Sequence, residues 1–246
     1  MSETQVVILC GGLGTRLRAV SGNVPKPLVE VAGKPFLVHQ IDYLKSQGFS
    51  RFLLLAGYRG DVFCTTLEKY NFRYELSIEP EPLGTGGALK SALDLLDEEF
   101  ILLNGDTYLD IQFVELVEKF RCLPSGGLVC ASSHSRSDGM VEANNLQVQD
   151  GKLLAYKKSA GDAVMTHVDA GAGIFQRKDI SRYLAPFEGA FSLEEDVWPK
   201  MISDNLLAVY FVEAKPFDIG TPERLSEFAR YMEKYADVDF TDAAED

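Results

Sequence analysis

Short apolar runs alternate with segments of helical period along the first half of this chain. Four runs predict strands: Gln5–Leu9, Arg51–Leu55, Tyr74–Ile78 and Phe100–Asn104. Four segments between or after them predict helices: Leu37–Gln47, Asp61–Tyr70, Thr85–Leu96 and Ile111–Phe120. This order predicts an α/β protein of three layers, in which helices cover both faces of a mostly parallel mixed sheet. Ligands of such sheets bind beyond the carboxyl ends of the strands.

The second half of the chain continues with more varied elements. Five further strands are predicted: Gly127–Ser133, Leu146–Gln149, Leu153–Tyr156, Val168–Phe175 and Leu207–Phe211. Asp150-Gly151 is a hairpin signal, and helices are predicted over about 194–202 and over Pro222–Tyr235. No repeat or long linker interrupts the chain, so we expect one domain over residues 1–235. Residues 236–246 hold five acidic and no basic residues and predict a solvated acidic tail.

The first apolar run breaks into a glycine-rich turn, which predicts a phosphate site at the end of a strand. Three glycines without a Cβ let the backbone adopt positive φ and direct N–H groups at phosphate oxygens: Gly11, Gly12 and Gly14. Arg16 can bind a phosphate with its planar guanidinium, and Lys26, held between two prolines, supplies a point charge.

Better-known glycine loops do not match this turn. Leu17 stands where G-x-G-x-x-G requires its third glycine, and the G-K-[ST] ending of a P-loop is missing. A tight turn with a surface arginine would explain the glycines alone. It does not explain Lys26 within P-K-P, so the combined pattern favours phosphate binding.

Charge and cysteine content exclude several classes of protein. The 246 residues have a formal net charge of −13, which disfavours a nucleic-acid partner because a phosphate backbone needs a basic face. The four cysteines show no C-x-x-C spacing, which disfavours a zinc site or a disulfide framework and fits the cytoplasm: Cys10, Cys64, Cys122 and Cys130. No secretion signal or apolar run of about 18 residues is present, so we expect no membrane association.

Two aspartates are candidate metal ligands. Asp106 follows the strand that ends at Asn104, at the same sheet edge as the glycine turn, and Asp218 lies between a strand and a helix start. Two carboxylates beside a phosphate site suit Mg²⁺, which takes one or two protein carboxylates and completes its shell with phosphate oxygens and water. Each has another interpretation, since Asp218 could cap the following helix and Asp106 could be a turn residue.

Taken together, these motifs resemble those of the sugar-1-phosphate nucleotidyltransferases. The resemblance spans Val6 to about Glu223 and rests on G-G-x-G-T-R-L followed by P-K-P-L, on G-D, on P-L-G-T-G-G-A and on D-I-G-T-P-E. It implies a Rossmann-like nucleotidyltransferase fold. Within the family, the spacing and the motifs P-K-P-L, G-K-P-F, P-L-G-T-G-G-A and F-S-L-E-E-D are most similar to those of D-glycero-D-manno-heptose-1-phosphate guanylyltransferases.

The resemblance implies a role for each matching residue. The triphosphate would be held by Gly11, Gly12, Gly14, Thr15 and Arg16. Lys26 would act with Arg16 on the reacting phosphate, and Asp106 and Asp218 would bind Mg²⁺. Gly86 and Gly87 would let the nucleobase approach the backbone at a helix start. The sugar side would be formed by Gly139, Lys158, Asp169 and Gly173, with Lys158 on the sugar phosphate.

Two positions depart from the family pattern. Many members have Glu-Lys where this chain has Lys157-Lys158, and an asparagine where it has Gly171. The missing carboxylate and amide would bind sugar hydroxyls, so the identity of the sugar stays open. Asp169 is a candidate for part of that task, and Lys157 is also explained as a solvated lysine at a strand end.

The resemblance implies an enzyme that condenses a nucleoside triphosphate, GTP favoured, with a sugar-1-phosphate, heptose-1-phosphate favoured. Alternatives are a uridylyl-, cytidylyl- or thymidylyltransferase acting on another sugar-1-phosphate, or a non-catalytic subunit that binds nucleotide sugars. A glycosyltransferase would use a D-x-D pair, and Asp106 and Asp110 do not have that spacing. The sequence leaves the oligomeric state open, a homo-oligomer included.

Overall fold

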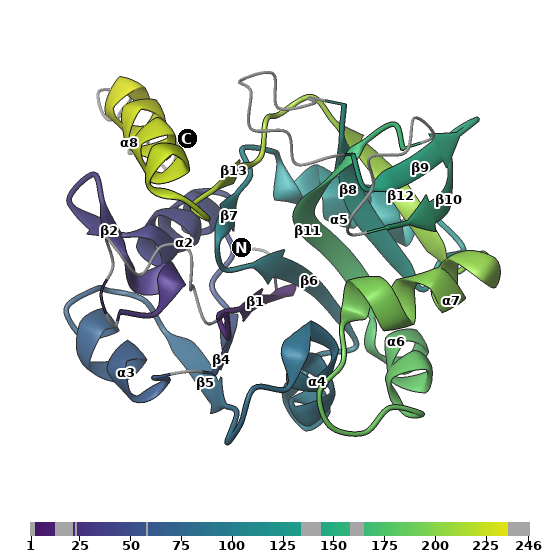
Figure 1. The fold of residues 1–246 in the computed structure, drawn as a ribbon, viewed down its shortest axis with the longest axis horizontal. Coiled ribbons are helices and arrows are strands. Elements are labelled where there is room, and N and C mark those ends of the chain that lie inside the picture. Colours follow the sequence, from purple (N-terminus) through teal and green to yellow (C-terminus); the bar gives the residue numbers. More distant parts are fainter. Residues whose placement is uncertain are drawn as a thin grey trace.

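The computed structural model describes residues 3–12, 22, 24–57, 59–133, 144–157 and 165–235. A seven-stranded sheet in the order β12-β8-β11-β6-β1-β4-β5 forms its centre (Figure 1). The strands are β1 (Gln5–Leu9), β4 (Phe52–Ala56), β5 (Tyr74–Ile78), β6 (Glu99–Asn104), β8 (Gly127–Ser132), β11 (Val168–Gln176) and β12 (Leu207–Val212). Neighbours are parallel except at β11, which is antiparallel to both β6 and β8. The predicted α/β class with a mostly parallel mixed sheet is confirmed.

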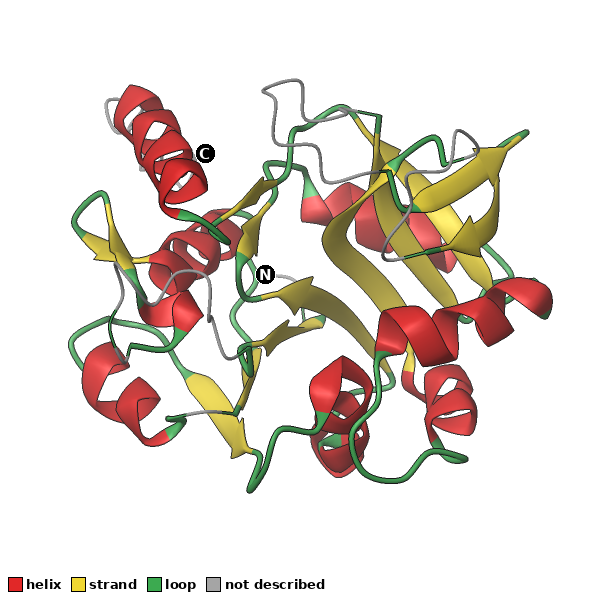
Figure 2. Ribbon diagram, viewed as in Figure 1, coloured by secondary structure: helices red, strands yellow, loops and turns green. Residues whose placement is uncertain are grey.

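Helices cover both faces of this sheet (Figure 2). They are α2 (Phe36–Ser46), α3 (Asp61–Leu67), α4 (Gly84–Ser91), α5 (Phe113–Arg121), α6 (Arg177–Leu184), α7 (Trp198–Ser203) and α8 (Pro222–Tyr235). The helix predicted over about 194–202 begins as a π-helical turn, η3 (Leu193–Val197), and α6 was not predicted. No helix in the described ranges has the length and apolar character needed to cross a bilayer.

Both faces of the central strands are buried. In β1, Val6 and Ile8 belong to the core cluster that contains Ile41 of α2, whereas Val7 belongs to the cluster that contains Leu89 of α4. Strands covered on both faces are apolar along most of their length, which is why β1 shows no alternation of polar residues. Polar chemistry is therefore confined to the strand ends.

Several short elements lie outside the central sheet. They are the 3₁₀ turn η1 (Lys26–Leu28), the pair β2 (Glu30–Val31) and β3 (Lys34–Pro35), the 3₁₀ turn η2 (Leu93–Leu95), the pair β7 (Thr107–Tyr108) and β13 (Phe217–Asp218), and the hairpin β9 (Leu146–Gln149) and β10 (Lys152–Tyr156). The predicted hairpin signal is confirmed, because Asp150 and Gly151 both have positive φ between antiparallel strands.

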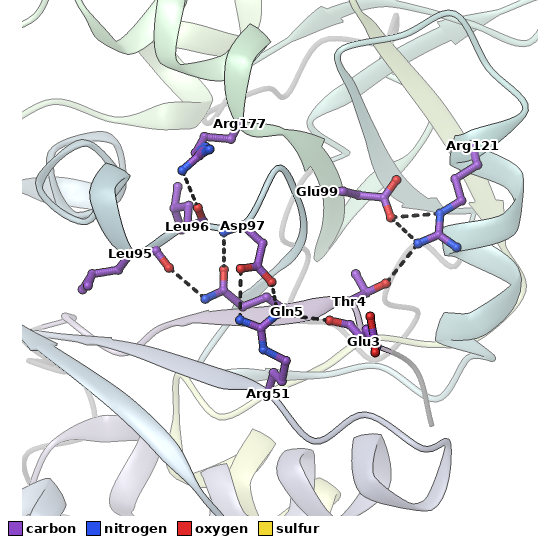
Figure 3. Close-up of polar contacts among 10 residues, drawn as sticks. All are labelled: Glu3, Thr4, Gln5, Arg51, Leu95, Leu96, Asp97, Glu99, Arg121 and Arg177. Carbon is purple, nitrogen blue, oxygen red and sulfur yellow. Dashed lines mark hydrogen bonds and ion pairs between the residues drawn. The ribbon is translucent and has the colours of Figure 1, made fainter.

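A polar network closes the amino-terminal end of the sheet (Figure 3). The buried side chain of Gln5 donates to Leu95 O at 2.9 Å and accepts from Asp97 N at 3.0 Å. Arg51 binds the Asp97 carboxylate, and Arg177 donates to Leu96 O at 2.8 Å. These contacts tie β1, the start of β4 and the start of α6 to the segment that precedes β6. The opposite, carboxyl-terminal end is where the polar residues of the site gather.

Candidate functional site

A cavity of about 290 Å³ lies beyond the carboxyl ends of β1 and β6. Its walls come from five separate segments of the chain: the glycine turn, η1, the connection from β5 to α4, the end of β6, and η3. The lining residues are Leu9, Cys10, Gly11, Gly12, Lys26, Pro27, Glu79, Pro82, Gly84, Thr85, Ala88, Asn104, Asp106 and Glu194. The position is the one expected for a ligand of an open α/β sheet.

The glycine turn enters the cavity as predicted for its first two residues. Gly11 and Gly12 line the wall, and a Cβ on Gly11 would lie 3.0 Å from Oε1 of Glu79 and 3.5 Å from Gly57 N. A side chain at position 11 would therefore require the Glu79 carboxylate to shift by a few tenths of an ångström. The other predicted members of the turn, Gly14, Thr15 and Arg16, lie outside the described residues.

Lys26 and Asp106 form an ion pair at the wall of the cavity. Lys26 opens η1, and its side chain is 14% exposed, against 38% for Asp106. The two residues are 80 positions apart in the chain. The structure therefore brings the predicted phosphate-binding lysine onto one of the two predicted metal ligands.

Asp218 is brought beside Asp106 by the pairing of β13 with β7. Asp218 pairs with Thr107, and Ile219 N donates to Asp106 O at 3.0 Å. The carboxylate is bound by Nη1 of Arg224, which lies 2.9 Å from both oxygens, and by Gly220 N at 2.7 Å. The predicted juxtaposition of the two aspartates is present.

Helix capping does not account for Asp218. Thr221 lies closer to α8, and its Oγ1 accepts from Arg224 N at 3.4 Å. Among the described residues, no group of three or more histidine, cysteine, aspartate or glutamate side chains could hold a metal ion. A metal held here would therefore depend on two carboxylates and on oxygens supplied by a substrate.

The glycines at the start of α4 are required by packing inside the protein. A Cβ on Gly86 would lie 2.3 Å from the Phe191 ring, and Gly86 N already donates to Phe191 O at 3.0 Å. A Cβ on Gly87 would lie 2.7 Å from Cβ of Leu83. The cavity wall is instead formed by Gly84, Thr85 and Ala88. A nucleobase role for Gly86 and Gly87 stays a prediction, but the structure supplies another reason for both glycines.

Two acidic residues of the cavity wall were not singled out from the sequence. Glu79 Oε2 accepts from Leu83 N at 2.9 Å, and burial raises the pKa of the Glu79 carboxyl. Glu194 accepts from Thr85 Oγ1 at 2.6 Å and from Ser192 Oγ at 2.7 Å. Their signal was present, because Glu79 precedes the P-L-G-T-G-G-A motif and Glu194 lies in F-S-L-E-E-D. Nothing in the spacing showed that both face one cavity.

A second, small cavity of about 10 Å³ adjoins the first and shares Leu9, Asn104 and Glu194 with it. The predicted residues Asp169 and Gly173 line it. Asp169 Oδ1 accepts from Gly171 N at 3.0 Å. Burial raises the pKa of Asp169 to about 7, against the effect of that hydrogen bond and with a further contribution from the charge of Glu194. Gly139 and Lys158 lie outside the described residues.

The small cavity is also lined by two neutral hydrogen-bond donors, the indole of Trp198 and the side-chain amide of Asn104. The buried Nε1 of Trp198 has no hydrogen-bond partner among the described residues. Gly171 has a φ of +69°, and Nδ2 of Asn104 lies 3.2 Å from the position of its missing Cβ. Asn104 thus supplies an amide beside the position where many family members have asparagine. The small cavity combines carboxylate acceptors with neutral donors, and its volume of about 10 Å³ has room for about one water molecule.

Comparison with known proteins assigns the chain to a family. The family model described as nucleotidyl transferase matches residues 5–235, so the chain belongs to this family. The resemblance to sugar-1-phosphate nucleotidyltransferases predicted from the motifs is confirmed. The crystal structure of HddC from Yersinia pseudotuberculosis is similar at a TM-score of 0.78 and 32% identity, covering 93% of this chain and 99% of that one. A second structure of HddC, complexed with GMP-PN, has a TM-score of 0.76.

Curated relatives and a more distant structure agree with this assignment. The mannose-1-phosphate guanyltransferase of Hypocrea jecorina is 32% identical over 225 residues, which are 88% of this chain and 61% of that protein. The chain thus spans less than two thirds of the length of this relative. The inositol-1-phosphate CTP transferase of T. maritima shares the fold at a TM-score of 0.80 and 20% identity, covering 95% of this chain and 96% of that one.

Proposed function

We propose that the protein is a sugar-1-phosphate guanylyltransferase, which converts GTP and a sugar-1-phosphate into a nucleotide sugar and pyrophosphate. The observation that carries this proposal is that Lys26 and Asp106 line a cavity together with the glycine turn, while the pairing of β13 with β7 places Asp218 beside them. One cation and two carboxylates beside backbone N–H groups are the groups that phosphoryl transfer uses.

The reaction requires no nucleophile from the protein. An oxygen of the sugar-1-phosphate attacks the α-phosphorus in line, a new P–O bond forms, and the bond to the bridging oxygen breaks so that pyrophosphate leaves. Lys26 and Arg16 stabilise the charge that develops on the α-phosphate. The triphosphate is held in line by the turn residues Gly11, Gly12, Gly14 and Thr15.

Asp106 and Asp218 fit a Mg²⁺ ion by the chemistry of their donor set, since both are carboxylates on neighbouring strands and Asp106 lines the cavity. When bound, Mg²⁺ neutralises charge on the triphosphate and orients its oxygens. The two side chains hold it, and Lys26 leaves Asp106 to bind the reacting phosphate.

A guanine base is supported by the carboxylate of Glu79 and by two relatives. Guanine presents two donors on its pairing edge, and a carboxylate can accept from both. HddC has been solved with GMP-PN, and the curated relatives include the mannose-1-phosphate guanyltransferase of Hypocrea jecorina. Gly86 and Gly87 allow the close packing that sets the position of the α4 amino terminus beside this base.

A heptose-1-phosphate is the favoured acceptor, and mannose-1-phosphate is the second candidate. A D-glycero-D-manno-heptose has the same ring configuration as mannose. The motifs shared with heptose-1-phosphate guanylyltransferases and the similarity to a mannose-1-phosphate guanyltransferase therefore both favour a manno-configured sugar. Asp169 accepts from sugar hydroxyls, Gly139 and Gly173 leave room for the ring, and Lys158 binds the sugar phosphate. We expect such an enzyme to act in the cytoplasm, with a homo-oligomer possible.

A substrate grid tests this proposal. The four common ribonucleoside triphosphates and thymidine triphosphate are each combined with heptose-, mannose- and glucose-1-phosphate, and pyrophosphate release is measured with Mg²⁺ present. We expect the highest kcat/KM for GTP with a manno-configured sugar. A clear lead for another triphosphate would overturn the guanine assignment, and no pyrophosphate release from any pair would favour a non-catalytic subunit.

Substitution of the two aspartates tests whether they bind the metal. Asp106→Asn and Asp218→Asn keep the shape of each side chain and remove its charge, so we expect turnover to fall about 10²–10³-fold. The melting temperature should change little in Asp106→Asn, whose side chain is 38% exposed, and should fall in Asp218→Asn, because Arg224 loses the partly buried carboxylate that it binds. Near-normal activity in a folded Asp106→Asn variant would contradict the assignment of Asp106 to the metal.

A further inference from the structure

Each of the two candidate metal ligands is held by a basic side chain of the same chain. Asp106 pairs with Lys26, and both oxygens of Asp218 lie 2.9 Å from Nη1 of Arg224. The side chains of Asp218 and Arg224 are only 12% and 13% exposed. The sequence-based roles include Lys26 but assign nothing to Arg224.

Three of these charged groups, Asp218, Lys26 and Arg224, lie around Gly220, and Asp106 joins them through its ion pair with Lys26. If Gly220 had a Cβ, that atom would lie 2.8 Å from Oδ1 of Asp218, 3.6 Å from Nζ of Lys26 and 3.7 Å from Nη1 of Arg224. Any residue larger than glycine would therefore enter the space between the two cations. Among the described residues, Lys26 and Arg224 bring two positive charges and Asp106 and Asp218 two negative charges into this cluster.

A divalent cation alone is a poor ligand for this cluster. The cation would have to bind the Asp218 oxygens that the Arg224 guanidinium already binds. Arg224 would then lose this carboxylate and lie close to a second positive charge in a partly buried position. A cation that arrives with a triphosphate brings its own anions. The planar guanidinium can then exchange a carboxylate for phosphate oxygens, which match its geometry equally well.

We propose that Arg224 is a positioning residue that occupies Asp218 until the metal and the triphosphate arrive together, and that it then moves onto the phosphate oxygens. This inference rests on the proposed function, because it takes the triphosphate as the substrate that releases Arg224. Its consequence is that metal and nucleotide bind with strong mutual dependence, each weak without the other.

Binding of Mn²⁺, used as a probe without turnover, tests this exchange. Titration calorimetry measures the dissociation constant of Mn²⁺ alone and in the presence of a non-hydrolysable GTP analogue. Arg224→Met removes the charge and keeps an unbranched apolar side chain in place of the aliphatic part of the arginine. The matched control is Arg230→Met, an exposed arginine on the same helix, α8.

In the native chain we expect weak binding of Mn²⁺ alone and a large gain when the analogue is present. Arg224→Met should bind Mn²⁺ alone about tenfold more tightly, since the competitor for Asp218 is gone, and should lose most of the gain from the analogue. Asp218→Asn in the Arg224→Met background should remove the added affinity. Arg230→Met should behave as the native chain does.

Unchanged or weaker Mn²⁺ binding in Arg224→Met would overturn the exchange. Should Arg224→Met fail to fold, Arg224→Lys keeps the charge and removes the planar fork, and it should still weaken the dependence of Mn²⁺ binding on the analogue. Native dependence in the Arg224→Lys variant would contradict the proposal. Binding is read without pyrophosphate release, so an inactive protein with the expected Mn²⁺ behaviour would refute the proposed function and leave this exchange standing.

Discussion

Glu79 is the cavity residue to which we assign selection of the nucleobase. One of its oxygens holds Leu83 N, and the other lies near the glycine turn, where a Cβ on Gly11 would be 3.0 Å away. The carboxylate therefore joins the β5 to α4 connection to the turn that follows β1. A charge change here would affect recognition more than folding, since an amide oxygen can still accept from Leu83 N.

We expect Glu79→Gln to lower kcat/KM for GTP about 10–100-fold, because the glutamine amide accepts from only one guanine donor and turns a donor towards the other. The discrimination between GTP and the remaining triphosphates should narrow. Steady-state kinetics on all five triphosphates measure the effect. Glu81→Gln, at an exposed neighbouring position, is the control and should leave the preference intact.

Two lysines should differ in their kinetic signature. Lys26→Ala should lower kcat about 10²–10³-fold with a smaller effect on KM, because Lys26 acts on charge that develops in the transition state. Lys158→Ala should mainly raise the KM of the sugar-1-phosphate. Initial rates with each substrate varied in turn separate the two effects, and the opposite pattern would show that the two roles are exchanged.

Asp169 predicts a pH-dependent stability. An ordinary aspartate has a pKa of about 3.9, and here burial raises it to about 7. Between these values the folded protein keeps a proton that the unfolded chain has lost, so the contribution of Asp169 to the free energy of unfolding falls as the pH rises from about 4 to about 7. Above pH 7 this contribution is constant, because both states are ionised.

Asp169→Asn removes this titration while its amide oxygen can still accept from Gly171 N. We expect the variant and the native chain to be equally stable near pH 4, and the variant to be more stable by about 1–3 kcal/mol at pH 8, the value being reduced for partial exposure. Denaturant unfolding across this range measures the difference. Asp150→Asn, at an exposed turn position with a φ of +51°, is the control and should show no such trend.

At the scale of elements, α4 and the segment before η3 form one packed unit. Gly86 lies against the Phe191 ring, Phe191 N donates to Leu83 O, and Thr85 Oγ1 accepts from Leu193 N at 2.9 Å. Phe187 stacks on Phe191 with ring centres 4.7 Å apart. The contacts join segments about 105 positions apart and fix where α4 begins.

Gly86→Ala tests this packing. In a solvent-exposed helix the change would stabilise by about 1 kcal/mol, but here the new Cβ would lie 2.3 Å from the Phe191 ring. We therefore expect a loss of about 1–3 kcal/mol in the free energy of unfolding. Chemical denaturation measures it, and Phe191→Leu in the same chain should recover part of the loss. A stabilised Gly86→Ala variant would show that α4 does not pack in this way.

The bounds of helices and strands could be predicted where the sequence pattern of neighbouring residues determines them. β1, β5 and α8 have the predicted bounds, because apolar runs and a proline at a helix start are properties of neighbouring residues. The strands β7 and β13 have two residues each and were not predicted. Their pairing joins residues about 110 positions apart, so no periodic pattern in either segment could indicate it.

At the scale of the whole molecule, the described elements end with α8 at Tyr235, and the family model also ends there. The assignment of residues 1–235 to one domain and of 236–246 to an acidic tail stays a prediction. We expect a chain ending at Tyr235 to keep the melting temperature and the kcat/KM of the full chain, because five acidic residues without basic neighbours have little apolar area to bury. A drop of several degrees or of tenfold in kcat/KM would contradict it.

By itself, the sequence determined the α/β class, the family, the glycine turn at the end of β1, and the identity of the lysine and the two aspartates that meet there. All of these depend on residues close together in the chain, where period, turn chemistry and motif wording carry the information. Only the tertiary structure decided that Arg224 holds Asp218, that Glu79 and Glu194 face one cavity, and that packing against Phe191 and Leu83 requires Gly86 and Gly87. The physical reason is that these contacts depend on how separate segments pack in space, and that packing leaves no periodic trace along the chain.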